Sequence, residues 1–203
     1  ALSHQEEKAE PGYYSVNLYA GQLTVELTAS RRCGLQRYRY DTGGEIPVVV
    51  DLKYGSESAC TIQTEHDVDT VYASAFEWVD SCTIRGYRFS NGWTPRQQVY
   101  FYSKFSSPIK ACALYVDDQR IKEVSSAEGR NVKALLTFEN ECGELEVRTA
   151  LSSVSMEGAA ANLQSEIEGK TFEEVRLSAS ESWSRTLGQI EIETDDPKKK
   201  ELF

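Results

Sequence analysis

The residues best suited to binding chemistry lie between Arg85 and Trp93, in the segment R-G-Y-R-F-S-N-G-W. The ring of Trp93 can stack on the C–H face of a pyranose, and the side chains of Arg88 and Asn91 can donate hydrogen bonds to sugar hydroxyls. Asn91 and Gly92 form a hairpin-turn signal, which places Trp93 at a loop tip or just after one. We therefore select Trp93 and Arg88 as candidate substrate-binding residues. The alternative is that Trp93 packs beneath the following loop.

Paired carboxylates can act as general acid and general base in the cleavage of a glycosidic bond. The sequence contains 32 Asp and Glu residues, so such pairs are always found. Three adjacent pairs each have a local structural explanation, either in a loop or at the start of a helix. We therefore nominate no catalytic residue. These pairs are Asp117-Asp118, Glu173-Glu174 and Asp195-Asp196.

The histidines and cysteines do not form a metal-binding pattern. His4 lies in a polar terminal stretch, and His66 lies between two acidic residues in a predicted exposed turn. The five cysteines are widely spaced, with no C-x-x-C or Cys/His cluster, so we expect no metal site in this chain. We expect free thiols, mostly in strands, and a bridge between neighbouring strands is the alternative. The cysteines are Cys33, Cys60, Cys82, Cys112 and Cys142.

Charge and hydropathy exclude two classes of partner. The formal net charge is −10, and there is no stripe of Lys and Arg residues, so a nucleic acid partner is not expected. No apolar run approaches the roughly 20 residues that a membrane-spanning helix needs. A neutral substrate is compatible with this composition.

Alternating apolar and polar residues predict about eleven strands. Successive short strands separated by turn residues favour a mainly β fold, a large antiparallel β-sandwich. The predicted strands cover Tyr13 to Tyr19, Leu23 to Leu27, Cys33 to Tyr40, Ile46 to Leu52, Ala59 to Thr64, Val68 to Val79, Cys82 to Ser90, Val99 to Phe105, Ile109 to Val116, Val132 to Phe138 and Leu145 to Leu151.

Three stretches carry more specific expectations. The apolar run Val48 to Val50 predicts a strand buried on both faces. The stretch from Asp117 to Arg130 is the most polar long segment, and we expect it to be a mobile loop. Ala1 to Glu10 shows no strand pattern of its own.

The chain changes character after Ser155, which divides it into a sandwich at residues 1–155 and a helical linker at residues 156–203. A short helix is predicted from Met156 to Leu163, and Ile190 to Glu193 reads as a short strand before a last helix at Pro197. Between them, Thr171 and a glutamate three residues later form a capping box that opens a long helix. One face of this helix is apolar, and the following Gly188 suggests a left-handed end. The apolar face consists of Phe172, Val175, Ala179, Trp183 and Leu187.

Several motifs in a fixed order resemble the domain junction of glycoside hydrolase family 92, the calcium-dependent exo-acting α-mannosidases. The resemblance covers nearly the whole chain. The motifs are Ser3-His4 through Val16, Val25 through Ser30, Arg37-Tyr38, Gly86 through Arg88, Ser90 through Trp93, Ser152 through Ala159, Asn162-Leu163, Phe172 and the Ala179/Trp183/Leu187 face.

This resemblance implies that the chain is most of the family's N-terminal β-sandwich. The opening of that domain and an (α/α)6 catalytic domain are expected to lie outside it. The parent enzyme is then expected to remove terminal α-linked mannose from glycans with inversion, with α-1,2 as the expected linkage. Its acid, base and calcium ligands would lie in the catalytic domain, so this chain alone should be inactive. Secretion, the periplasm or the cell surface is the implied location.

The resemblance also assigns roles within this chain. The helix that carries Trp183 would pack on the catalytic domain, and His4 would approach the rim of the active site as a third candidate substrate-binding residue. Gln36 and Arg39 depart from the family pattern, which leaves the linkage preference open. Two other functions are alternatives, a free-standing carbohydrate-binding sandwich and a purely structural module between domains.

Overall fold

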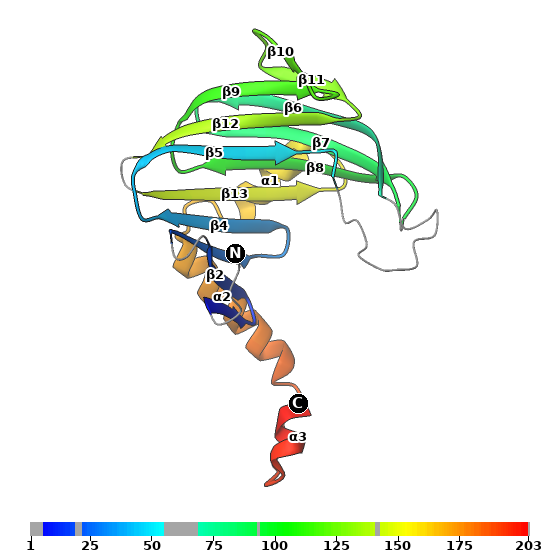
Figure 1. Ribbon diagram of the computed structural model, residues 1–203. Coiled ribbons are helices and arrows are strands. Elements are labelled where there is room, and N and C mark those ends of the chain that lie inside the picture. The colour runs from blue at the N-terminus through cyan, green and yellow to red at the C-terminus, as the bar shows by residue number, and fades with distance from the viewer. Residues whose placement is uncertain (1–5, 19–21, 55–68, 93, 141–142, 203) are drawn as a thin grey trace.

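A computed structural model describes residues 6–18, 22–54, 69–92, 94–140 and 143–202 of the chain. Within these residues the strands form one nine-stranded and one four-stranded sheet, and every paired strand is antiparallel. The two sheets face each other, and three helices follow the last strand (Figure 1). The predicted β-sandwich with helices at its C-terminal end is confirmed.

The larger sheet has the strand order β1-β2-β3-β4-β13-β8-β7-β6-β11 among the described residues. It extends well past the smaller sheet at the β1 to β4 side (Figure 1). Its strands are β1 (Glu7–Glu10), β2 (Tyr13–Leu18), β3 (Leu23–Ala29), β4 (Cys33–Tyr40), β6 (Thr70–Asp80), β7 (Thr83–Asn91), β8 (Gln97–Phe105), β11 (Ser126–Gly129) and β13 (Glu144–Ser152).

The smaller sheet has the order β10-β9-β12-β5 in the described part of the chain. Its strands are β5 (Gly44–Asp51), β9 (Ile109–Val116), β10 (Gln119–Ile121) and β12 (Val132–Asn140). Only one face of β5 meets the other sheet: Ile46, Val48 and Val50 point to the core, and Val49, which alternates with them, lies on the outer face and is exposed. The prediction that Val48 to Val50 is buried on both faces is therefore wrong.

The core between the sheets is made by the inward-facing residues of the alternating strands. Phe76, Leu114, Leu136, Phe138 and Leu145 are among its fully buried members. A second core lies on the opposite face of the nine-stranded sheet, where α1 (Met156–Glu166) and α2 (Phe172–Leu187) pack. Its buried members are Cys33, Leu35, Ala150, Leu163, Ile167, Phe172 and Val175.

The structure corrects two further expectations from the sequence. Glu7–Glu10 forms the short strand β1, and the polar stretch from Asp117 to Arg130 contains β10 and β11. Asp117 and Asp118 both have positive φ, 50° and 62°, and they form the tight turn between β9 and β10. Aspartate tolerates this conformation better than most residues, so the pair has a structural cause. The strand predicted at Ala59 to Thr64 lies outside the described residues.

The helical end of the chain agrees with the sequence except after α2. Thr171 and Glu174 form the predicted capping box. Gly188 has a φ of −72°, so it is not in the left-handed region, and a Cβ there would lie 2.8 Å from the carbonyl oxygen of Ser184. Residues 190–193 form no strand, and α3 (Pro197–Leu202) follows. None of the described helices combines the length and apolar character needed to cross a membrane.

The two halves of α2 differ in their surroundings. Phe172 and Val175 are only 2% and 3% exposed against the sheet, whereas Trp183 and Leu187 are 51% and 57% exposed. Figure 1 shows the helix leaving the sheet as it runs toward α3. Trp183 therefore does not lie in the core of the sandwich.

Candidate functional site

Arg88 connects three neighbouring segments of the sandwich. Its Nη2 donates to Asp69 Oδ2 at 2.8 Å, its Nε to the carbonyl oxygen of Leu52 at 3.1 Å, and its Nη1 to Ser90 Oγ at 3.1 Å. The side chains of Arg88 and Asp69 are mostly buried. Arg88 thus ties the segments after β5 and before β6 to β7. Its contact with a sugar remains a prediction.

The loop between β7 and β8 begins beside this ion pair. A Cβ on Gly92 would lie 3.2 Å from the Cα of Asp69, so glycine allows the two backbones to approach closely. Asn91 Oδ1 accepts a hydrogen bond from the backbone N–H of Arg96 at 2.9 Å, which closes the loop. Trp93 and His4 lie outside the described residues, so their proposed substrate contacts also remain predictions.

A groove of about 920 Å³ lies where β4 begins and β13 ends. We call it the strand-end groove. Its lining is mainly uncharged, with apolar side chains beside hydroxyls and amides, and two arginines stand at one edge. The residues that line it are Ala29, Ser30, Arg31, Arg32, Cys33, Gly34, Gln36, Gln98, Val99, Thr149, Leu151, Ser152, Ser153, Val154, Gly158 and Asn162.

Hydrogen bonds made by α1 and its N-cap fix one wall of the strand-end groove. Asn162 Nδ2 donates to the carbonyl oxygen of Leu151 at 2.7 Å, which ties the helix to the end of β13. Ser155 caps the helix by accepting from the N–H of Gly158 at 2.9 Å. A Cβ on Gly158 would lie 2.8 Å from Ser152 Oγ, so a larger residue at this position would displace that hydroxyl.

Glu166 at the end of α1 fixes the edge of the groove that carries the arginines. Its carboxylate accepts from Ser30 Oγ at 2.5 Å and from the backbone N–H of Arg32 at 3.0 Å, and it pairs with Arg32 Nε at 2.5 Å. Burial raises the pKa of Glu166, but these hydrogen bonds outweigh it and lower the pKa below its ordinary value of 4.5. The turn between β3 and β4 is therefore held by an ionised carboxylate.

A buried ion pair anchors the first half of α2. Glu26 on β3 accepts two hydrogen bonds from Arg37 on β4, at 2.8 and 2.9 Å, and a third from Tyr13 at 2.8 Å. Arg37 also donates to Glu173 at 2.8 Å, and its guanidinium carbon lies 4.0 Å from the centre of the Phe172 ring. The helix thus covers a charged pair with an aromatic ring, which is a favourable cation–π arrangement.

Burial raises the pKa of Glu26, whereas hydrogen bonds from Arg37 and Tyr13 lower it, and the net result is a pKa below 4.5. The two residues that the sequence analysis expects to depart from the family pattern lie on the same strand as Arg37. Arg39 pairs with Glu26 at 2.7 Å, and Gln36 accepts a hydrogen bond from the hydroxyl of Tyr38.

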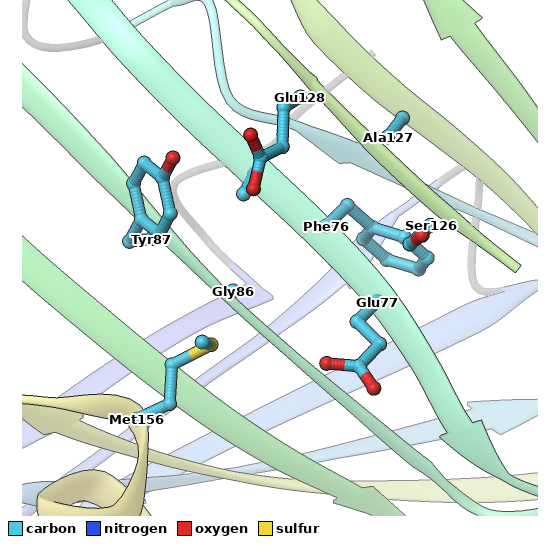
Figure 2. A pocket seen from close by; sticks show the side chains of 9 residues that line it. Phe76, Glu77, Gly86, Tyr87, Ser126, Ala127, Glu128 and Met156 are labelled. Carbon is cyan, nitrogen blue, oxygen red and sulfur yellow. The ribbon is translucent and has the colours of Figure 1, made fainter.

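A second hollow, of about 420 Å³, lies over β6, β7 and β11 beside the start of α1. Figure 2 shows Tyr87, Glu128, Glu77 and Met156 around Gly86. Glu77 is already paired with Arg85 at 2.7 Å. Burial and the charge of Glu128 raise the pKa of Tyr87, so the hydroxyl stays protonated at neutral pH. The hollow therefore contains two carboxylates, of which Glu77 is already engaged by Arg85.

The adjacent carboxylates have structural roles. Asp118 pairs with Lys133 at 2.6 Å, Glu174 belongs to the capping box, and Asp196 Oδ1 accepts from the N–H of Lys198 at 3.0 Å. Among the residues that the structure describes, no three His, Cys, Asp or Glu side chains are grouped to hold a metal ion.

Three of the cysteines can be assigned. Cys33, Cys82 and Cys112 are free thiols. Burial raises the pKa of Cys112 to about 11 and also raises that of Cys33, so both are unreactive thiols at neutral pH. Cys60 and Cys142, like His66, lie outside the described residues.

Sequence reasoning found part of the strand-end groove. Ser152 and Asn162 belong to the motifs that carry the family resemblance, and both line the groove. The sequence does not identify Gln98 and Thr149 as groove residues, because a single polar residue in a strand has the same pattern as any residue exposed to solvent. The register of β13 with β4 and β8 brings these residues together.

Two family models match the chain. The Glycosyl hydrolase family 92 N-terminal domain matches residues 1–152, and the Glycosyl hydrolase family 92 catalytic domain matches residues 158–203. Curated protein sequences contain no significant match to the chain.

Solved structures of the same family share this fold. A family GH92 α-mannosidase from Bacteroides thetaiotaomicron is 28% identical, with a TM-score of 0.84, and the match covers 96% of this chain and 26% of that one. The same mannosidase in complex with mannoimidazole gives a TM-score of 0.83 at 28% identity, covering 96% and 25%. A family GH92 inverting mannosidase from B. thetaiotaomicron VPI-5482 gives 0.78 at 28% identity, covering 95% and 24%. The chain therefore spans about a quarter of the length of these enzymes.

Proposed function

Because the chain belongs to glycoside hydrolase family 92, we propose that it serves as the N-terminal sandwich of an α-mannosidase that removes terminal α-linked mannose from glycans with inversion. The observation that carries this proposal is the match to both domains of the family in their order along the chain. The similar solved structures include an inverting mannosidase and a mannosidase bound to mannoimidazole, which supports mannose as the sugar. We further propose an α-1,2 linkage and a secreted, periplasmic or cell-surface location.

The chemistry of inversion supports the proposal that the catalytic acid and base lie in the catalytic domain. Inversion needs a carboxylic acid to protonate the leaving oxygen and a separate carboxylate to activate water on the opposite face of the sugar. The buried and paired carboxylates of the described residues are engaged in caps, turns and ion pairs. We propose that this chain supplies support and one wall of the substrate pocket, and that it has no hydrolytic activity by itself.

Calcium is the metal that the family resemblance implies. The described residues do not fit such a site, because they contain no group of three His, Cys, Asp or Glu side chains that could hold an ion. We propose that the calcium ligands, like the acid and base, belong to the catalytic domain. The residues of this chain are therefore not proposed to bind calcium or to act through it.

Two surfaces support a role in pocket formation. The exposed apolar half of α2, with Trp183 and Leu187, would pack on the catalytic domain, since residues 158–203 themselves match that domain. The strand-end groove would face the substrate with Gln98, Thr149 and Asn162, whose neutral side chains suit a neutral sugar.

The test is release of mannose from α-1,2-, α-1,3- and α-1,6-mannobiose, with added calcium or with a chelator. We expect release only from the chain continued past Phe203 into the catalytic domain, with the α-1,2 substrate cleaved fastest. Proton NMR of the first product should show β-mannose, the inverted anomer. Retained α-mannose would overturn inversion, and equal rates without calcium would overturn the metal requirement.

The alternative of a free-standing carbohydrate-binding module is favoured by one observation, the hydroxyl and amide side chains that line the strand-end groove beside its two arginines. It predicts measurable affinity of this chain alone for mannosides, lost in Trp93→Ala. No mannose release from either length of the protein, together with such binding, would replace the enzyme proposal by this one.

A further inference from the structure

A cleft of about 450 Å³ lies between the turn that joins β3 to β4 and the second half of α2. We call it the α2 cleft. One wall is the turn together with the end of α1, and the other wall is a face of α2 on which small side chains flank a tryptophan. Its lining includes Arg31, Glu166, Lys170, Ser178, Ser182 and Trp183.

Hydrogen bonds hold the turn side of the α2 cleft in one position. The carboxylate of Glu166 accepts from Ser30 Oγ at 2.5 Å and pairs with Arg32 Nε at 2.5 Å. The backbone N–H of Ser30 donates to the carbonyl oxygen of Cys33 at 2.8 Å, which closes the turn. Arg31 lies between these residues and is therefore carried by a turn that is fixed before any partner arrives.

The α2 cleft is positively charged, although the whole chain has a net charge of −10. Within the described part of the chain, Glu166 is the one acidic residue of its lining, and the ion pair with Arg32 neutralises this carboxylate. Lys170 Nζ donates to the backbone carbonyl of Glu166 at 2.6 Å, which leaves its charge unbalanced. Arg31 is exposed, and its guanidinium makes no hydrogen bond or ion pair with any residue that the structure describes. Two unbalanced cations favour a partner that carries carboxylates.

The helix side of the α2 cleft presents apolar surface that the sandwich does not cover. Trp183 is 51% exposed, and Ser178 and Ser182 line the cleft beside it. Because these two side chains are small, another element can approach the backbone of α2 closely. Tryptophan and arginine are the residue types that most often dominate the binding energy of protein interfaces. The cleft that contains Trp183 and Arg31 thus has the composition of a docking surface.

The catalytic domain is the partner that fits this surface. Residues 158–203, which include the helix that forms one wall, match the catalytic domain of the family, and the chain covers only 26% of a similar mannosidase. The remainder of such an enzyme follows directly from this helix. A second copy that docked symmetrically through the same surface would place one positive cleft against another, which like charges oppose.

We propose that the α2 cleft receives an acidic segment of the catalytic domain, with one carboxylate of that segment paired to Arg31 and its apolar side chains packed on Trp183. This inference rests on the proposed function, because it requires a catalytic domain after this chain. It adds the chemistry of the contact. The ion pair at Arg31 fixes how the two domains are oriented, whereas Trp183 supplies the buried apolar area.

The first test is cross-linking of the chain continued into the catalytic domain and carrying Arg31→Lys. A carbodiimide joins a carboxylate to a lysine amine in direct contact with it, with loss of water and without a spacer. Mass spectrometry should find position 31 joined to an aspartate or glutamate beyond residue 203. Arg120→Lys on β10 is the control and should give no such link.

Two results of this experiment would overturn the proposal. In the first, position 31 is joined only to residues 1–203 or to no residue. In the second, a mixture of ¹⁴N- and ¹⁵N-labelled protein shows that the link at position 31 connects two molecules, which would assign the α2 cleft to a second copy.

Charge reversal is the second test. In the continued protein, Arg31→Glu should make the amides of residues 180–187 exchange about tenfold faster, because the new carboxylate would face another carboxylate across the interface. In the 203-residue chain, the midpoint of urea unfolding should not change, since the Arg31 side chain has no partner in the described part of this chain. Arg120→Glu makes the same charge change on β10 and should alter neither quantity. Unchanged exchange in Arg31→Glu would overturn the proposal.

Mannose release by the unsubstituted continued protein separates this inference from the proposed function. Release of mannose without a contact at position 31 would overturn the docking inference and leave the enzyme proposal in place. A contact at position 31 in a protein that releases no mannose would overturn the enzyme proposal and support the docking inference.

Discussion

The two halves of α2 carry the same kind of apolar face but lie in different surroundings. The first half covers the Glu26–Arg37 pair with Phe172 and is buried, whereas the second half presents Trp183 and Leu187 to solvent. Periodicity alone cannot separate these cases, since both halves follow the same three- and four-residue spacing. We propose that this helix contacts two bodies, the sandwich through its first half and the catalytic domain through its second half.

The largest loss of stability should come from a substitution in the first half of α2, whose apolar side chains are buried. Phe172→Ala removes a ring that is 2% exposed and should lower the free energy of unfolding by about 4 kcal/mol. Trp183→Ala removes a larger ring but should change this chain by no more than about 0.5 kcal/mol. Urea denaturation of both variants measures the contrast. Equal losses would mean that the two halves of α2 do not differ as described.

Glu26→Ala should cost about 3 kcal/mol, because it leaves the guanidinium of Arg37 buried with fewer partners. The control is Glu173→Ala, which removes the exposed partner of the same arginine and should cost under about 1 kcal/mol. The measurement is again urea denaturation. A Glu26→Ala variant as stable as the control would show that the pair does not anchor the helix.

Lowering the pH should remove part of the stability that the Glu26–Arg37 ion pair provides. The pKa of Glu26 in the folded chain lies below its ordinary value of 4.5, and so does that of Glu166. The stability from both carboxylates is therefore complete above about pH 4.5 and is lost as the pH falls through the lower, folded-state pKa values. Unfolding measured between about pH 7 and pH 3 should show this decline, and Glu26→Gln should flatten it. If Glu26→Gln lost the same amount of stability over this pH range, the loss would come from titratable groups other than Glu26.

The smallest effect should come from the first turn of the helix. Thr171→Ala removes the side chain that accepts from the N–H of Glu174 at 3.2 Å and should cost about 1 kcal/mol. Thr171→Ser keeps the hydroxyl and serves as the control. Far-ultraviolet circular dichroism during thermal unfolding would follow both variants. A loss in Thr171→Ser equal to that in Thr171→Ala would exclude the capping hydroxyl as the cause.

Alternating side chains predict most of the strands, and the bounds of β4 and β9 agree with the sequence pattern to the residue. The alternation of side chains does not predict features that depend on where a strand lies in the folded sheets. Val49 is exposed because it lies on the outer face of the smaller sheet, and β10 and β11 are polar strands whose pairing with β9 and β6 is not visible in their composition. Of the candidate site residues, Arg88 lies in an ion network that spacing does not reveal.

Hydrogen exchange along α2 tests the central claim most directly, with the 203-residue chain compared against the chain continued into the catalytic domain. The amides of residues 175 and 176 should be protected in both proteins, because they are hydrogen-bonded within the helix and this turn packs on the sandwich. Residues 180–187 should exchange faster in the short chain and become protected in the long one. Equal exchange of residues 180–187 in the two proteins would contradict the claim that this half of the helix packs on the catalytic domain.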